Sequence, residues 1–215
     1  MRFSRSDEFE VLDLGRTDYA AVDALMMERL EAIVAGAAPD TLLLAEFDPV
    51  LTVGRASGAD RADAYAALGI PVHEIARGGK ATFHGPGQLV AYPLLRLEED
   101  ARDLHAYLHA LEEALILTVG EFDLTGARDP RNTGCWIGGH KVASIGVAVR
   151  KWVTYHGLAL NVDTDLAWFR KFDPCGLEPD LMTTMAKELG GEVPEMEAVR
   201  AVLARHLKAT LRVSV

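Results

Sequence analysis

The 215-residue sequence predicts an α+β fold built on a largely antiparallel or mixed sheet. Segments with the composition of strands outnumber the helical patterns, and most are joined by short turns. A doubly wound sheet would require strands and helices to alternate along the chain, which they do not. The sequence has no internal repeat, low-complexity tract or Pro- and Ser-rich linker, so we expect a single domain over residues 1–215.

The first elements are a strand, "FEVLDLG", and a helix from about Asp18 to Ala35. Thr17 can cap this helix, and Gly36 can end it. Its apolar residues recur at helical spacing: Val22, Leu25, Met26, Leu30 and Ile33. Two strands and a short helix are predicted next: "DTLLLAEF", "PVLTVG" and about Asp60–Leu68.

The rest of the chain has the same mixed character. A β-rich segment with sharp bends covers residues 72–95, and a helix is expected over about Asp103–Val119. "GCWIGGHKVASIGVAVR" predicts a hairpin about Gly138 and Gly139, and "VTYHGLALNV" predicts a further strand. A C-terminal amphipathic helix from about Pro194 to Leu211 should turn four apolar residues inward: Met196, Val199, Leu203 and Leu207.

Composition and charge restrict the function classes. No apolar run approaches the length of about 20 residues that crosses a bilayer, and the N-terminus carries acids where a signal peptide is apolar, so we expect a cytoplasmic protein. A net charge of −10 argues against nucleic-acid binding. Acidic protein partners would need local basic patches, for which the candidates are Arg77, Lys80, Arg128, Arg131, Arg150, Lys151, Arg170 and Lys171.

The segment "RGGKATFHGPGQLVAYP", residues 77–93, is too rich in glycine for an ordinary core strand. It is either a hairpin with an irregular tip or the wall of a ligand slot that exposes backbone at its glycines. The spacing matches neither a P-loop nor a dinucleotide-binding fingerprint, so a nucleotide site is not indicated.

Two residues, Lys141 and Cys175, could form an activated nucleophile. Lys141 lies in the apolar stretch "HKVASIGV" and either faces solvent or turns inward, where a buried ammonium needs a partner. Cys175 lies in "FDPCGL", where proline and glycine favour a turn, and a neighbouring ammonium would favour its thiolate.

Cys135, in "TGCWIG", is expected to be an inert buried thiol. His156 is either a base or a structural histidine at a turn.

Four motifs in this order and spacing resemble the octanoyltransferases of lipoate biosynthesis: "RGGKATFHGPGQLVAYP", "HKVASIGV", "YHGLALNV" and "DPCGL". The resemblance runs from about residue 10 to 190 and includes "PVLTVGR". That family is similar in fold to the catalytic domains of biotin and lipoate protein ligases, which implies a larger mixed sheet flanked by helices and a small second sheet.

The resemblance implies transfer of an octanoyl group from acyl carrier protein to a lysine of a lipoyl domain. The acceptors would be the lipoyl domains of 2-oxoacid dehydrogenase complexes and the glycine cleavage H protein, without a cofactor or metal. Cys175 matches the family's nucleophile and Lys141 its activating lysine. The implied substrate-binding residues are Arg77, Gly78, Gly79, Lys80, Ala81, Thr82, Phe83, His84, Ser144, Ile145, Gly146, Gly157, Leu158 and Ala159. Phe83 and Lys80 depart mildly from the family pattern.

Two alternatives stay open at this point. One is an ATP-dependent lipoate or biotin protein ligase on the same fold, which would form an acyl-adenylate and needs no nucleophilic cysteine. The other is a non-catalytic module that binds the carrier protein without forming a thioester.

Overall fold

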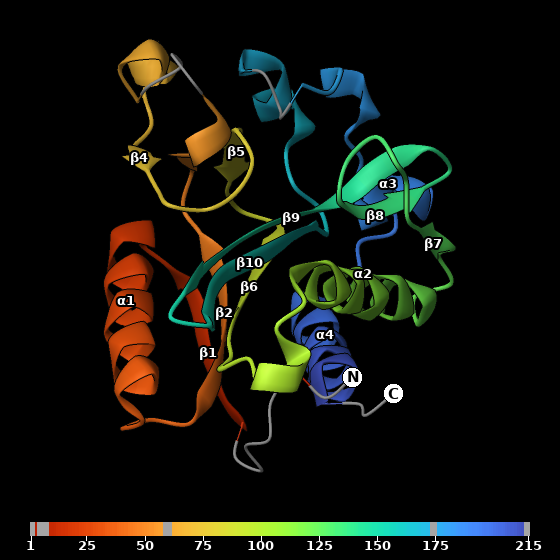
Figure 1. The fold of residues 1–215 in the computed structure, drawn as a ribbon. Coiled ribbons are helices and arrows are strands. Elements are labelled where there is room, and N and C mark those ends of the chain that lie inside the picture. Colours follow the sequence, from red (N-terminus) through yellow and green to blue (C-terminus); the bar gives the residue numbers. More distant parts are fainter. Residues whose placement is uncertain (1–2, 4–8, 58–61, 173–175, 213–215) are drawn as a thin grey trace.

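The computed structural model describes residues 3, 9–57, 62–172 and 176–212, and it confirms the predicted α+β fold. Within these ranges the strands form a seven-stranded sheet and a smaller three-stranded sheet (Figure 1). In spatial order the larger sheet contains β1 (Phe9–Thr17), β2 (Asp40–Phe47), β6 (Gln88–Leu94), β10 (Val153–Asn161), β9 (His140–Arg150), β8 (Gly134–Ile137) and β7 (Gly126–Ala127). The smaller sheet contains β4 (Val72–Glu74), β3 (Val50–Val53) and β5 (Ala81–His84).

Both sheets are mixed. In the larger one, β1 is parallel to β2, and the other neighbouring strands run antiparallel. In the smaller one, β3 pairs in parallel with β4 and antiparallel with β5. The expected hairpin of "GCWIGGHKVASIGVAVR" is confirmed as β8 and β9. The hairpin interpretation of residues 77–93 is wrong, because β5 and β6 belong to different sheets.

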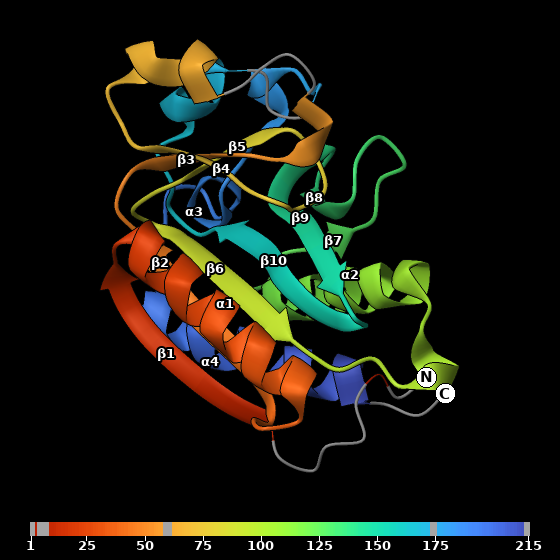
Figure 2. The same cartoon turned by 60° about the vertical axis from the view of Figure 1, so that its left-hand side comes forward.

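Helices cover the two faces of the larger sheet (Figure 2). The described helices are α1 (Tyr19–Ala35), α2 (Leu104–Gly120), α3 (Met185–Glu188) and α4 (Met196–Arg212). One core cluster joins α2 and α4 to the sheet, and a second joins α1 to the opposite face. The inward set predicted for the last helix is confirmed for Val199, Leu203 and Leu207, while Met196 is partly buried. Within the described ranges, every helix is too short or too polar to span a membrane.

The capping residue of α1 differs from the prediction. Asp18 is the N-cap, and its carboxylate accepts a hydrogen bond from the backbone N–H of Ala21 at 3.1 Å. Thr17 is instead the last residue of β1. Aspartate and threonine both serve as caps, so the pattern alone could not choose between adjacent candidates. Gly36 ends the helix in the left-handed conformation, as expected.

The smaller sheet packs on a third apolar cluster. Leu51, Val53, Ala81 and Phe83 from its strands meet Phe169, which lies on a 3₁₀ helix at Leu166–Lys171. Further 3₁₀ helices occupy Arg55–Ser57, Ala62–Leu68, Glu99–Ala101 and Pro179–Leu181. The short helix expected at about Asp60–Leu68 is therefore a 3₁₀ helix within the described residues, and Asp60 lies outside them.

Candidate active site

A cavity of about 500 Å³ lies where the smaller sheet meets the larger one. Its walls come from β5, β6, β9 and β10, from the glycine-rich segment before β5 and from residues 130–133. The volume is within the range of about 300–1,000 Å³ that is usual for small-molecule sites. All of the predicted substrate-binding residues except Ala81 and Phe83 line this cavity.

Two of the sequence motifs form one wall because they are paired strands. In the antiparallel register of β9 and β10, Ser144 lies opposite Ala159 and Ile145 opposite Leu158. The third pair of this wall joins two glycines, residues 146 and 157. The motifs are 13 positions apart in the sequence, and strand pairing brings them side by side.

The glycine-rich segment, residues 77–80, is held by backbone hydrogen bonds on both sides. The Gly78 N–H donates to the Val147 carbonyl of β9 at 3.0 Å, and the Lys80 carbonyl accepts from Gly54 at 3.2 Å. The approach requires glycine at residue 54, where an added Cβ would lie 2.4 Å from the Gly79 carbonyl oxygen. The segment is therefore a fixed part of the cavity wall.

Arg77 is a buried cavity residue and not part of an exposed basic patch, which corrects its place among the surface candidates. Its guanidinium donates to the Thr52 carbonyl and hydroxyl oxygens, both at 2.9 Å, and to the Gly78 carbonyl at 2.9 Å. A guanidinium presents several donors in a fixed plane, so it can join β3 to the glycine-rich segment. Several other candidates for a basic surface patch form ion pairs with acidic side chains. Arg128 pairs with Glu112 and Glu113, Arg131 with Asp129, Arg150 with Glu31 and Arg170 with Asp180.

A buried polar network extends from this arginine to His84. The His84 Nδ1 donates to the Gln88 side-chain oxygen at 2.7 Å, because the Gln88 amide nitrogen is already used to donate to Asn161 at 2.9 Å. The Nε2 of the same ring is 3.4 Å from the Thr52 hydroxyl. Burial lowers the pKa of His84 to about 4, so the imidazole is neutral at pH 7. Asn161 in turn donates to the Thr183 backbone carbonyl at 3.1 Å.

His156 lies within β10 and not at a turn, so that part of its interpretation is wrong. Its backbone has φ of 56°, which is uncommon for a residue other than glycine. Its side chain is buried and lines the cavity, and its Nδ1 has no hydrogen-bond partner among the described residues. Burial lowers the pKa of His156 to about 3, which makes it a neutral imidazole in the cavity wall.

These two histidines should make the protein sensitive to acid. Their pKa values are below the ordinary 6.5 in the folded state, so the unfolded chain takes up protons below that pH that the folded protein does not. Each neutral histidine therefore stabilises the folded protein fully above pH 6.5. This stabilisation is lost as the pH falls toward about 4 for His84 and about 3 for His156. At pH 5 the loss is about 2 kcal/mol per histidine.

We therefore expect His156→Asn to remove about 2 kcal/mol of the difference in unfolding free energy between pH 7.5 and pH 5. Asparagine tolerates the positive φ of this position. Urea unfolding at both pH values measures the difference, with the exposed His105→Asn as the matched control. A His156→Asn protein that keeps the full pH dependence of the parent would contradict the assignment.

Lys141 turns inward, the second of the two orientations that the sequence left open. It is only 2% exposed, and its ammonium donates to the side-chain oxygen of Asn132. The Nζ also lies 6.0 Å from the ring centroid of Trp136. Both contacts favour the charged form of a buried amine. Lys141 is among the residues that line the cavity described above.

The space for this lysine depends on Gly134, the first residue of β8. An added Cβ at residue 134 would lie 2.1 Å from the Ala143 carbonyl oxygen and 2.9 Å from the Cε of Lys141. Gly134 also has φ of 148°, a conformation that other residues rarely adopt. Glycine is required here so that the lysine side chain can pass the end of β8.

The remaining candidates are placed as follows. Ala81 and Phe83 face the apolar cluster of the smaller sheet, on the opposite side of β5 from Thr82 and His84. Cys135 is fully buried, and burial raises the pKa of its thiol to about 12, which confirms an inert thiol. Cys175 lies outside the described residues.

The cavity is also lined by residues that were not among the predicted substrate-binding residues: Ala56, Ile75, Tyr92, Pro130, Arg131, Asn132 and Thr133. Residues 130–133 carried only a turn signal, because "DPRNTG" combines proline, asparagine and glycine. A turn signal locates a loop but not the cavity that the loop borders.

Solved structures similar to this one include lipoate protein ligases and biotin protein ligases. A lipoate-protein ligase A bound with ATP superposes with a TM-score of 0.73 at 17% identity, covering 98% of this chain and 86% of that one. A putative lipoate protein ligase from T. acidophilum gives 0.71 at 17% identity, over 96% and 86% of the two chains. A biotin protein ligase from Aquifex aeolicus gives 0.58 at 16% identity, over 94% and 70%. At these identities the likeness defines the fold class.

The sequence comparisons are more specific. The lipoyl protein ligase A/B catalytic domain family matches residues 18–208. An octanoyltransferase of Geobacter metallireducens is 46% identical over 195 residues, which are 91% of this chain and 90% of the relative. An octanoyltransferase of Nitratidesulfovibrio vulgaris is 43% identical over 203 residues, 93% of each. The chain therefore belongs to the octanoyltransferase family and is an acyltransferase.

Proposed function

We propose that this protein, as a single domain over residues 1–215, transfers an octanoyl group from octanoyl-acyl carrier protein to the lysine of a lipoyl domain. Cys175 carries the group as a thioester, and Lys141 activates that cysteine. The observation that carries the proposal is a buried lysine amine in the wall of a 500 Å³ cavity, in a chain of the octanoyltransferase family.

The described neighbours of Cys175 support its pairing with Lys141. Leu177 and Lys141 line the same small cavity beneath β5. An added Cβ at Gly176 would lie 3.7 Å from the amine of Lys80, which lines the main cavity. Cys175 is therefore joined to residues that border the small cavity and lie beside Lys80 of the main cavity wall.

Downstream of this segment, backbone contacts fix the strand that carries the lysine. The Thr183 N–H donates to the Lys141 carbonyl at 3.0 Å, and Met182 forms an isolated parallel bridge with Lys141. The chain that follows Cys175 is therefore hydrogen-bonded to the start of β9. The described chain after Cys175 thus comes directly beside Lys141, which supports the proposed pairing.

The chemistry balances without another reactant. The Cys175 thiolate attacks the thioester carbonyl of the donor, the carrier thiolate leaves, and the octanoyl group is then a thioester of Cys175. The ε-amine of the acceptor lysine attacks this second thioester, forms an amide and releases the Cys175 thiolate. The Lys141 ammonium gives its proton to the departing carrier thiolate, and the resulting neutral amine then accepts the proton that the attacking lysine loses. Because an amide is more stable than a thioester, no ATP is needed.

The cavity wall suits an acyl chain. Three apolar residues of the paired strands β9 and β10 are among those that line the cavity: Ile145, Leu158 and Ala159. Burial of each methylene contributes about 0.8 kcal/mol. The glycine-rich segment and Arg77 border the same space with polar groups that can hold the carbonyl end or the arm of the carrier.

For the acceptors we propose the lipoyl domains of 2-oxoacid dehydrogenase complexes and the glycine cleavage H protein. One structural neighbour, at TM-score 0.69, is an archaeal lipoate protein ligase described together with its E2 lipoyl domain. That neighbour shares 20% identity with this chain, so it supports a common fold, and the acceptor remains part of the proposal.

Intact mass spectrometry tests the proposal. Incubation with octanoyl-acyl carrier protein in the absence of ATP should add one octanoyl group to the protein, located on Cys175 by peptide mapping. Adding a lipoyl domain should then move the group to the lysine of that domain. If octanoate and ATP together give an acyl-adenylate while the carrier thioester gives no adduct, the protein is instead an ATP-dependent ligase. Carrier binding without any adduct would identify a non-catalytic module.

A further inference from the structure

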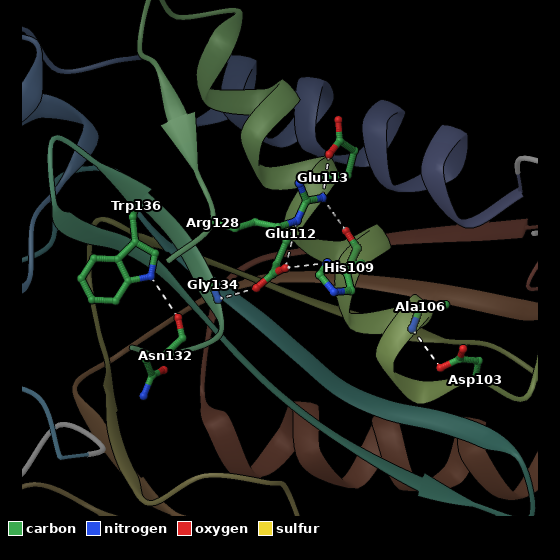
Figure 3. Close-up of polar contacts among 9 residues, drawn as sticks. All are labelled: Asp103, Ala106, His109, Glu112, Glu113, Arg128, Asn132, Gly134 and Trp136. Carbon is green, nitrogen blue, oxygen red and sulfur yellow. Dashed lines mark hydrogen bonds and ion pairs between the residues drawn. The ribbon is translucent and has the colours of Figure 1, made fainter. Parts of the chain in front are cut away.

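We propose that Glu112 of α2 is a positioning residue for Lys141, acting through the loop of residues 128–134 (Figure 3). This inference rests on the proposed function, because it assumes that Lys141 takes part in octanoyl transfer. Glu112 does not line the cavity and therefore acts on the amine only through the loop that it holds.

Glu112 contacts both ends of the loop. One carboxylate oxygen accepts the backbone N–H of Gly134 at 3.2 Å, and the other accepts the Nε of Arg128 at 3.1 Å. The second oxygen is also 3.4 Å from the Nδ1 of His109 on the same helix. The side chain is only 9% exposed, so these contacts are poorly screened by solvent. A buried carboxylate requires such partners.

The loop carries the acceptor for the lysine amine. Asn132 lies between the two contacts of Glu112, and its side-chain oxygen accepts from the Lys141 ammonium. Its backbone carbonyl accepts the Nε1 of Trp136 at 3.0 Å, which fixes the residue against β8. Figure 3 shows Asn132 and Gly134 on the same turn of the loop, opposite Glu112. Loss of the glutamate contacts would therefore free the residue that orients the lysine.

Gly134 gives the loop a second link to the lysine. The N–H that Glu112 accepts belongs to the glycine whose missing side chain leaves room for the Cε of Lys141. A shift of Gly134 would therefore change both the space for the lysine stem and the position of its acceptor. A displacement of about 1 Å in a catalytic group can reduce a rate by on the order of 100-fold.

Glu113 provides a matched control on the same helix. It accepts a hydrogen bond from the Nη2 of the same Arg128 at 2.7 Å, but its side chain is 44% exposed and makes no contact with Gly134. A change at Glu113 thus removes one contact of Arg128, while the contacts of the buried Glu112 with Gly134 and Arg128 remain.

The experiment compares Glu112→Gln, Glu113→Gln, Asn132→Ala and the double variant Glu112→Gln/Asn132→Ala. The rate of Cys175 octanoylation at pH 7 should fall on the order of 10-fold in Glu112→Gln, fall in Asn132→Ala, and stay within about 2-fold in Glu113→Gln. Because both changes act on Lys141 through the same loop, the double variant should lose clearly less activity than the product of the two single losses. Thermal unfolding verifies that each protein is folded.

A second experiment measures the chemical reactivity of the Lys141 amine and does not depend on octanoyl transfer. Trace labelling with acetic anhydride, followed by peptide mass spectrometry, gives the reactivity of Lys141 relative to the exposed Lys208. Loss of the Asn132 acceptor leaves more of the amine uncharged, so labelling of Lys141 at pH 7 should rise several-fold in Glu112→Gln and Asn132→Ala, and stay unchanged in Glu113→Gln.

The outcomes separate this inference from the proposed function. If every protein forms the octanoyl adduct and Glu112→Gln matches Glu113→Gln in both measurements, the positioning role is overturned and the proposed function stands. Multiplicative rate losses in the double variant would also overturn it. If no protein forms the adduct but Lys141 labelling rises as expected, the proposed function falls and the control of Lys141 by Glu112 is supported.

Discussion

Cys175→Ala protein should gain no octanoyl group from octanoyl-acyl carrier protein, whereas Cys135→Ala protein should gain one, as the parent does. The sequence contains only these two cysteines, so the pair of variants assigns the thioester to one sulfur. Intact mass spectrometry on denatured protein reads the result directly. A thioester is also released by neutral hydroxylamine, which distinguishes it from an amide on a lysine.

The physical argument for this difference comes from Cys135. Its thiol is fully buried within the core cluster between α2 and the larger sheet, and its raised pKa of about 12 leaves almost no thiolate at pH 7. An added Cβ at Gly126 would lie 3.0 Å from its sulfur, so the packing around it is tight. An adduct that survives Cys175→Ala and disappears with Cys135→Ala would refute the proposed nucleophile.

Much of the fold could be predicted because its elements have strong local signals. Apolar periodicity and a terminal glycine predicted α1, and strand-like composition predicted β2, β9 and β10. The division of the strands between two sheets came only from the family resemblance. β5 and β6 are separated by three residues and still pair with different partners, which depends on long-range packing and not on the turn between them.

The orientation of Lys141 shows where the pattern of a strand is insufficient. Simple alternation allows one buried face, but Lys141, Val142 and Ala143 are all buried. The register between β8 and β9 is irregular at Cys135 and Trp136, and both faces of β9 are covered at this point. A local break in register re-aims side chains, and its position is not evident from a single sequence.

The sequence likewise did not indicate that α2 contributes a residue to the site. Glu112 and Glu113 are adjacent acids on an otherwise largely apolar helix, and the sequence gives no reason to bury one and expose the other. The difference arises because Glu112 faces the loop of residues 128–134. Only the tertiary structure brings a helix residue to a loop that is more than 15 positions later in the chain.

Lys141→Met should slow octanoylation of Cys175 at pH 7 by about 30-fold or more. A thiol with an ordinary pKa near 8.5 is only about 3% ionised at this pH, so removal of a neighbouring ammonium that keeps the thiolate formed has at least this effect. Methionine is unbranched and similar in length to the lysine stem, so it can occupy the buried space beside Gly134. Stopped reactions followed by intact mass spectrometry give the rate.

The pH dependence separates loss of activation from a general loss of structure. In the Lys141→Met protein the rate should rise about tenfold per pH unit between pH 6 and 8, because the thiolate fraction does so below its pKa. The parent should show a flatter profile, since its thiolate is already formed at lower pH. The exposed Lys208→Met on α4 removes the same charge far from the cavity and should match the parent. If Lys141→Met retains both the rate and the flat profile of the parent, Lys141 does not activate the nucleophile.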